Sequence, residues 1–277
     1  MNGEERRKQL GSNAAPVEEE IEASFDRIVE EGAQRLARSW PTMLVTGTFG
    51  GLEIGIGVMA YLAVMHQTQD HLLAGLAFGI GFIALLLAKS ELFTEGFLIP
   101  ITAVAAKEAS IRQLVKLWGT TLVMNLVGGW AFMWIVVQGF PQWKPELETA
   151  ARHFVDAGFS WQTLCLAVLG GSTITLMTRM QHGTDSDLAK MAAAVAGGFL
   201  LAGLQLFHSI LDSLLIFGAI HAGVEVSYLD WLGWFGYTLL FNVLGGILLV
   251  TALRLVRNKE LIRERREGAP EDPDAAR

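Results

Sequence analysis

A histidine and a carboxylate lie four residues apart within a strongly apolar stretch, residues 201–221. The stretch reads LAGLQLFHSILDSLLIFGAIH, and His208 and Asp212 are the ionisable side chains in its middle. Ionisable groups inside a segment of membrane-spanning length are costly, and they usually serve a function there. An imidazole, whose reference pKa lies near neutral pH, can exchange a proton with a permeating molecule or hydrogen-bond it. His208 and Asp212 are therefore the first candidate site residues.

A second apolar stretch is interrupted in a similar way. Within residues 72–105, the motif SELFTE places Glu91, Thr94 and Glu95 among mostly apolar side chains. The full apolar segments that contain the two motifs, residues 72–105 and 189–221, are also longer than one simple bilayer crossing requires. A helix is interrupted at membrane depth only where the freed backbone groups are buried in protein or line a cavity. The pattern therefore predicts two broken helices.

Six apolar segments are available to position these residues. Hydrophobic residues make up 52% of the 277-residue chain, which also contains 30 glycines, and this composition is typical of helical membrane proteins. The sequence therefore predicts an all-α membrane protein with six transmembrane helices, of which the second and fifth are broken. The expected segments lie near residues 42–65, 72–105, 113–138, 160–178, 189–221 and 229–256.

Hydrophilic tails flank this transmembrane domain, which is expected at residues 40–257. The N-terminal tail is expected at residues 1–39 and the C-terminal tail at residues 258–277. Within the first tail, residues 18–38 have apolar side chains at helical spacing, which predicts an amphipathic helix. Such a helix would lie on the membrane surface or against the channel mouth, or would pack on a neighbouring protomer.

An internal repeat relates the two halves of the chain. The third segment contains Asn125-Leu-Val-Gly128-Gly129 and the sixth contains Asn242-Val-Leu-Gly245-Gly246, an offset of 117 residues. The same offset places Glu91 over His208 and Glu95 over Asp212, so the two interruptions coincide. Near this offset, Gly50-Gly51 matches Gly170-Gly171. Because each half would hold three spans, the halves must have opposite orientations, which is a 3+3 inverted repeat.

The inverted repeat predicts where the two breaks lie and which kind of molecule they bind. They would face each other near the middle of the bilayer, where transporters form their substrate sites. The backbone N–H groups that begin each half-helix favour an anion at that place.

Some of the candidate residues also have structural interpretations. The sequence Ser209-Ile-Leu-Asp212 has the form of a capping box, which would start a half-helix at Ser209 with Asp212 as reciprocal acceptor. Thr94 and Glu95 would cap the half-helix of the second segment in the same way. We expect the remaining repeat residues to brace the helices or to allow their close approach. These are Asn125, Asn242, Gly128 and Gly245.

Other features limit the functional class. The single cysteine, Cys165, excludes an intramolecular disulfide framework. The histidines show no metal-ligand spacing with carboxylates, so we expect no metal and no cofactor. The net charge of -7 is concentrated in the tails, and no basic stripe indicates a nucleic-acid partner. An enzyme using Glu91, Glu95, His208 and Asp212 is disfavoured, because no nucleophile or second histidine lies near them in the sequence.

The loops predict the orientation in the membrane. Lysine and arginine residues lie in the second and fourth connections and after the last segment, whereas the first and fifth connections have none. The positive-inside rule therefore places both termini in the cytoplasm. The expected location is the cell membrane, inner or plasma, with several crossings of the lipid bilayer.

Four motifs together resemble the formate/nitrite transporter family. They are Ser90-Glu-Leu-Phe-Thr-Glu95, Asn125-Leu-Val-Gly128, Cys165-Leu-Ala-Val168 and His208-Ser-Ile-Leu-Asp212. The resemblance runs from about residue 25 to 257 and is closest to divergent members. It implies an aquaporin-like protomer with its own pore in a homopentamer. It also implies passage of small monovalent weak-acid anions, together with protons, such as formate, nitrite, acetate, lactate or hydrosulfide.

The resemblance also implies roles for individual residues. Thr94 would hydrogen-bond His208, the central pore histidine. Phe78 and Phe82 would form one hydrophobic constriction, and Leu201 would contribute to the other.

The chain departs from the family pattern at several positions. Many members carry a lysine where this chain has Thr175, and Arg179 is the nearest basic residue. Asp212 stands where the family often has asparagine, and Glu95 where it often has a small residue. Extra carboxylates repel an anion unless they are capped, paired or protonated.

Moving a charge through a dry constriction is costly in free energy. An isolated ion is strongly disfavoured there, whereas a neutral acid is not. His208 would serve as a proton donor or as a hydrogen-bonding selector, oriented by Thr94. The alternative is a neutral-solute pore of the aquaporin type, although the breaks carry ELFTE and HSILD instead of paired Asn-Pro-Ala caps.

Overall fold

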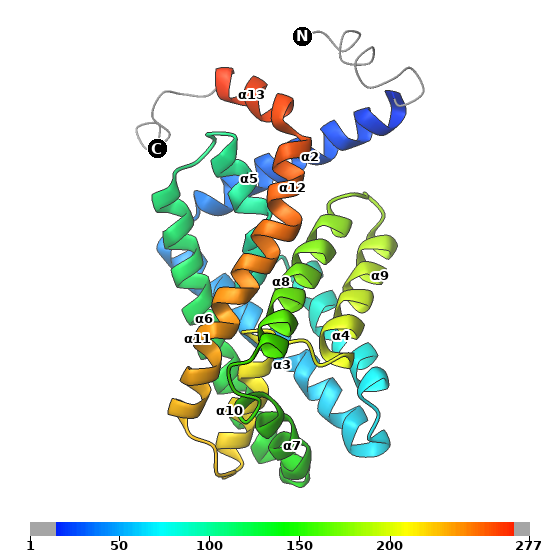
Figure 1. Cartoon of the computed structure of the whole chain (residues 1–277), viewed down its shortest axis with the longest axis vertical. Helices are drawn as coiled ribbons and strands as arrows, with labels where there is room; N and C mark the ends of the chain where they lie inside the picture. The colour runs from blue at the N-terminus through cyan, green and yellow to red at the C-terminus, as the bar shows by residue number, and fades with distance from the viewer. Residues whose placement is uncertain (1–14, 269–277) are drawn as a thin grey trace.

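The computed structural model describes residues 15–268, which form helices joined by short connections, with no strand in that range (Figure 1). The parts of the predicted tails at residues 1–14 and 269–277 lie outside it. In chain order the elements are α2 (Ala15–Leu36), α3 (Trp40–Thr68), α4 (His71–Ala88), the 3-10 turn η1 (Phe93–Phe97), α5 (Ile99–Ala105), α6 (Ile111–Gly139), η2 (Pro141–Trp143), α7 (Lys144–Val155), α8 (Trp161–Gln181), α9 (Asp187–Gly198), the π-helical η3 (Phe199–Gly203), α10 (Leu211–His221), α11 (Tyr228–Leu244), the π-helical η4 (Gly245–Thr251), α12 (Ala252–Arg257) and α13 (Lys259–Gly268).

Within residues 15–268, five helices are long and apolar enough to cross a membrane. They are Trp40–Thr68, His71–Ala88, Ile111–Gly139, Trp161–Gln181 and Tyr228–Arg257. The predicted segments at 72–105 and 189–221 are each divided into two helices. In the first, α4 is followed by the shorter apolar helix Phe93–Ala105, and in the second, α9 and η3 are followed by Leu211–His221. The polar interruptions in the sequence therefore mark real breaks in the helices.

The amphipathic helix α2 packs on α5. Its buried face includes Phe25, Ile28, Val29 and Leu36, as the apolar spacing predicted. The approach is close, because a Cβ atom on Gly32 would lie only 2.6 Å from the carbonyl oxygen of Ile99. The helix therefore lies against the channel-forming helices.

Two further helices lie where the sequence analysis expected a connection and a tail. The buried residues Leu147, Ala150, Ala151 and Phe154 form one face of α7, at the spacing of an amphipathic helix. The second helix, α13, lies at the same end of the molecule as α2 (Figure 1). Arg265 of α13 contacts Asp26 of α2 at 2.8 Å, which ties the two ends of the chain together.

Glycines let the long helices approach the breaks and one another. A side chain on Gly50 would overlap the carbonyl of Glu91, and one on Gly170 would overlap the carbonyl of Phe207. In the two helices that carry the N-x-x-G-G motif, Gly128 contacts the backbone of α3 and Gly245 contacts the backbone of α8. These contacts hold α3 and α6 against the first break and α8 and α11 against the second.

Candidate permeation site

Asn125 attaches the first break to the helices beside it. Its side-chain amide donates to the carbonyl oxygens of Gly47 at 2.7 Å and Glu91 at 2.8 Å. Its side-chain oxygen accepts the backbone N–H of Phe93 at 2.8 Å. The residue is fully buried, so three hydrogen bonds satisfy backbone groups that the broken helix leaves free.

Asn242 does the same for the second break. Its amide donates to the carbonyl oxygens of Ala167 and Phe207, both at 2.8 Å. Its side-chain oxygen accepts the backbone N–H of Ser209 at 2.8 Å. Each break is therefore held by one buried asparagine. This side chain forms two hydrogen bonds to backbone groups of the break and a third to a long helix, which is α3 for Asn125 and α8 for Asn242.

His208 and Thr94 meet across the two breaks. The Nε2 atom of His208 lies 2.9 Å from the hydroxyl oxygen of Thr94, and both residues are 0% exposed. The Nδ1 atom of His208 accepts the backbone N–H of Leu211 at 3.0 Å. Nδ1 therefore carries no proton, and the neutral imidazole has its proton on Nε2, which donates to Thr94.

Asp212 caps the second half-helix, although not in the predicted register. Its carboxylate accepts the backbone N–H of His208 at 2.7 Å, and the helix begins at Leu211 and not at Ser209. The reciprocal partner of Asp212 is therefore His208, whose ring accepts the N–H of Leu211. The N–H of Ser209 is taken by Asn242, and its hydroxyl has no partner among the described residues.

The prediction that Thr94 and Glu95 cap the other half-helix was wrong. No side chain caps η1 or the start of α5. The hydroxyl of Thr94 bonds to His208 instead. The backbone N–H of Glu91, which corresponds to that of His208 under the 117-residue offset, is already satisfied by the carbonyl of Thr46 at 3.2 Å. A capping carboxylate is therefore not needed there, and the side chain of Glu95 lines a cavity instead.

The predicted constriction residues are buried in the core. The rings of Phe78 and Phe82 pack edge to face, with 5.0 Å between their centroids. Phe78 also lies against Gly57 and Gly198. Leu201 is 1% exposed and lies in the π-helical turn that ends α9.

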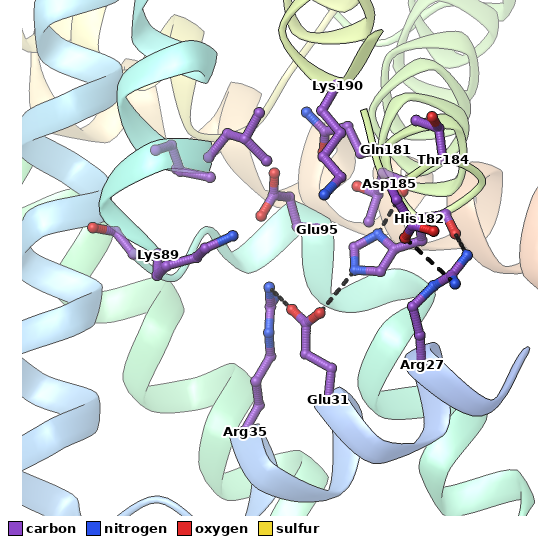
Figure 2. A pocket seen from close by; sticks show the side chains of 14 residues that line it. Arg27, Glu31, Arg35, Lys89, Glu95, Gln181, His182, Thr184, Asp185 and Lys190 are labelled. Carbon is purple, nitrogen blue, oxygen red and sulfur yellow. Dashed lines mark hydrogen bonds and ion pairs between the residues drawn. The ribbon is translucent and has the colours of Figure 1, made fainter. Parts of the chain in front are cut away.

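A cavity of about 130 Å³ lies where α2 meets the ends of α4 and α8 and the start of α9 (Figure 2). We call it the basic cavity because four cationic side chains line it: Arg27, Arg35, Lys89 and Lys190. Glu95 lines it as well, whereas Arg179, the basic residue that the sequence singled out, does not. Thr175 is buried and its hydroxyl bonds to the carbonyl of Gly171.

Glu91 joins the first break to the N-terminal segment. Its carboxylate forms an ion pair with Arg38 and a second one with Arg35 at 3.4 Å, and its side chain is 4% exposed. Both arginines lie in or just after α2. Glu91 is thus a buried anchor of the break.

The same ion-pair chain continues to the end of α8. Arg35 contacts Glu31 at 2.5 Å, and Glu31 accepts a hydrogen bond from Nε2 of His182 at 3.0 Å (Figure 2). Nδ1 of His182 faces the carbonyl of Thr178 at 2.8 Å, so both ring nitrogens face acceptors. Burial opposes ionisation of Glu31, but the hydrogen bond from His182 and the charge of Arg35 outweigh it and lower the pKa of Glu31 to about 2.

A second cavity, of about 170 Å³, lies at the opposite end of α4. It is lined in part by Tyr61, His71 and Glu146, and the Tyr61 hydroxyl lies 2.8 Å from Nδ1 of His71. We call it the tyrosine cavity. The 18 residues of α4 separate its two ends by about 27 Å. Between the cavities lie the fully buried Thr94 and His208.

Comparison with known proteins decides the family. The model of the family described as "Formate/nitrite transporter" matches residues 22–256 of this chain. The chain belongs to the formate/nitrite transporter family.

The relatives of this family member are similar to it over most of their length. The uncharacterized transporter YrhG of Bacillus subtilis is 24% identical, over 86% of this chain and 93% of its own. The formate channel BtFdhC of Bacillus thuringiensis is 22% identical, over 79% and 88%. The inner membrane protein YfdC of Escherichia coli is 24% identical, over 87% and 80%.

Two solved structures share the fold. A structure titled as an FNT family ion channel has a TM-score of 0.71 at 17% identity, with 84% of this chain and 98% of that chain covered. A pentameric formate channel with formate bound has a TM-score of 0.67 at 19% identity, with 78% and 96% covered. Members of this family are transporters and channels and not enzymes, so the chain is a multi-pass membrane transport protein.

Sequence reasoning missed several charged residues of this formate/nitrite transporter. His182 is hydrogen-bonded to Glu31 and His66 contacts Glu146 at 3.1 Å, although neither contact has a signal in the sequence. The cations of the basic cavity come from helices far apart in the sequence. The only local signal was the spacing of Glu31 and Arg35, four residues apart on one helical face.

Proposed function

We propose that this protein is a membrane channel or transporter for small monovalent weak-acid anions of the formate and nitrite class, with Thr94 and His208 as its selectivity site. The observation that carries the proposal is the hydrogen bond between these two buried side chains. It joins the two broken helices between the basic cavity and the tyrosine cavity. A fully enclosed polar pair at this place is what a permeating molecule would have to meet.

The geometry favours His208 as a hydrogen-bonding selector over His208 as a proton donor. A proton on Nδ1 would point at the backbone N–H of Leu211, which now donates to that atom. In the neutral ring, the Nε2–H group instead donates a hydrogen bond to the hydroxyl oxygen of Thr94. The hydroxyl hydrogen of Thr94 is then available to donate to an oxygen of the permeant.

We assign the apolar barrier to three aromatic and aliphatic side chains of the core. Phe78, Phe82 and Leu201 are 0–1% exposed, and we assign them to hydrophobic constrictions. An ion would lose its hydration there without compensation, whereas the neutral acid loses far less. The transported anion therefore crosses the constrictions together with a proton.

The architecture that we propose is an aquaporin-like 3+3 inverted repeat. It is supported by the equivalent hydrogen bonds of Asn125 and Asn242 and by the matching glycine contacts at Gly128 and Gly245. The similarity to a structure titled as a pentameric formate channel supports a homopentamer. Each protomer would hold its own pore within residues 40–257.

The proposed orientation has both termini in the cytoplasm of an inner or plasma membrane, with residues 1–39 and 258–277 as cytoplasmic tails. It is supported by the basic residues of the α5–α6 connection and of α13, which lie at the same end as α2 (Figure 1). Arg265 contacts both Asp26 and Glu108 there. The basic cavity would then open to the cytoplasm and the tyrosine cavity to the outside.

Reconstituted protein provides the test of substrate class. We expect proteoliposomes to take up radiolabelled formate and nitrite at least tenfold faster than empty liposomes, because the basic cavity attracts anions. The same vesicles should show no faster osmotic swelling in glycerol than empty ones. Fast swelling in glycerol without uptake of either anion would support a neutral-solute pore and contradict the proposal.

A further inference from the structure

Glu95 differs from the other acidic side chains near the basic cavity. It is 5% exposed, and no hydrogen bond or ion pair joins its carboxyl group to another of the residues 15–268. Figure 2 shows it directed into the cavity that Arg35, Lys89 and Lys190 also line. A buried carboxylate without a partner is strongly disfavoured, so this group favours taking up a proton.

The neighbouring acidic groups all have partners. Glu31 is held by Arg35 and His182, and Glu91 by Arg35 and Arg38. Asp185 contacts Arg27 at 3.4 Å, and Glu53 of α3 accepts the hydroxyl of Ser90 at 2.8 Å. These contacts engage the other carboxyl groups, although Oε2 of Glu53 has no partner among the described residues, whereas neither carboxyl oxygen of Glu95 forms a hydrogen bond or ion pair within residues 15–268.

The position of Glu95 in the repeat explains why it is free. Under the 117-residue offset it corresponds to Asp212, whose carboxylate caps the backbone N–H of His208. The equivalent N–H, that of Glu91, is bonded to Thr46. Glu95 is therefore released from the capping role that its counterpart fills.

We propose that Glu95 is the residue that exchanges a proton with the permeating anion in the basic cavity. In the outward direction, the protonated carboxyl group gives its proton to formate, so that the O–H bond of Glu95 breaks and one forms in formic acid. The Glu95 carboxylate that remains takes a new proton from hydronium in the cavity. In the inward direction, Glu95 first loses its proton to water in the cavity, arriving formic acid then gives its proton to the Glu95 carboxylate, and formate leaves into the cavity. The proposal rests on the proposed transport of weak-acid anions.

The location of Glu95 suits this step. Arg27, Arg35 and Lys190 are paired with acidic side chains. Lys89 forms no ion pair within residues 15–268 and attracts anions to the place where the proton is given. The next residue in the chain is Thr94, the hydrogen-bonding partner of His208. The acid formed at Glu95 therefore meets the selectivity pair directly, in the neutral form that can cross the constrictions.

The test uses full-length protein in proteoliposomes that contain a pH-sensitive dye. Formate uptake and proton entry are measured together between pH 5 and pH 8 for the wild type and for Glu95→Gln, Glu95→Ser and Glu95→Asp. We expect Glu95→Gln and Glu95→Ser to slow uptake at pH 7 by about tenfold or more and to flatten its pH profile. Glu95→Asp should keep the wild-type profile because it keeps a carboxyl group.

The controls separate this role from a structural one. Glu148→Gln makes the same chemical change on α7, at an exposed ion pair with Arg152, and should transport like the wild type. Thermal melting should show Glu95→Gln to be no less stable than the wild type, because glutamine has the same size and cannot ionise in this buried position. Wild-type uptake together with an unchanged profile in Glu95→Gln and Glu95→Ser would overturn this inference alone. Absence of formate uptake by the wild type would overturn the proposed function and this inference with it.

Discussion

Replacing Asn242 by aspartate is expected to destabilise the protein strongly. The variant keeps the oxygen that accepts the N–H of Ser209, but it replaces the amide that donates to Ala167 and Phe207. Two buried carbonyl groups lose their donor and face a carboxyl oxygen instead. Leaving a buried polar group unsatisfied costs about 1–3 kcal/mol, so the penalty for the two carbonyl groups is about 2–6 kcal/mol.

Thermal melting of the purified variant in detergent checks this prediction. A penalty of this size lowers the melting temperature by roughly 4–24 °C in a chain of this length. Gln162→Glu, the same chemical change at an exposed position of α8, serves as the control and should melt with the wild type. A melting temperature of Asn242→Asp equal to that of the control would show that the asparagine does not hold the break.

The second large effect is expected for His208→Asn. The variant loses the Nε2–H group that fixes the hydroxyl of Thr94, while its side-chain oxygen can still accept the N–H of Leu211. Thr94 then no longer presents its hydrogen to the permeant in a fixed direction. Loss of one such hydrogen bond in a buried site corresponds to about 1–2 kcal/mol, or roughly tenfold in rate. We expect formate flux to fall by about tenfold or more.

His221→Asn is the matched control, because His221 lies at the far end of α10 against Trp130. It should transport formate at the wild-type rate. Uptake by equal amounts of reconstituted protein, compared after gel filtration has shown the same assembly, gives the result. Wild-type flux and an unchanged pH profile in His208→Asn would contradict a selective role for the histidine.

The residues that sequence reasoning placed correctly are those with a strong local signal. Charged groups within apolar runs marked both breaks, since such groups are costly in a membrane. The carboxylate of Asp212 was also expected to cap a half-helix. The register was missed by one residue, because the imidazole of His208, and not the hydroxyl of Ser209, accepts the N–H at the helix start. A histidine at a helix start does not belong to the usual capping patterns.

The basic cavity could not be derived from the sequence in the same way. Arg35, Lys89 and Lys190 belong to α2, the end of α4 and α9, and only the packing of these helices brings them together. The sequence therefore directed attention to Arg179, the nearest basic residue in the fourth segment. The partner of Glu91 was missed for the same reason, because Arg38 lies 53 residues away in the chain. Tertiary packing decides contacts of this kind.

The most direct test of the account is whether formate crosses with a proton or as a bare anion. Wild-type proteoliposomes can be given either an inward proton gradient or a potassium diffusion potential set with valinomycin. The account predicts that the proton gradient drives formate accumulation and acidifies the vesicle interior, while the potential alone leaves the rate unchanged, because the species that passes the constrictions is neutral. Accumulation that follows the electrical potential and ignores the proton gradient would contradict it.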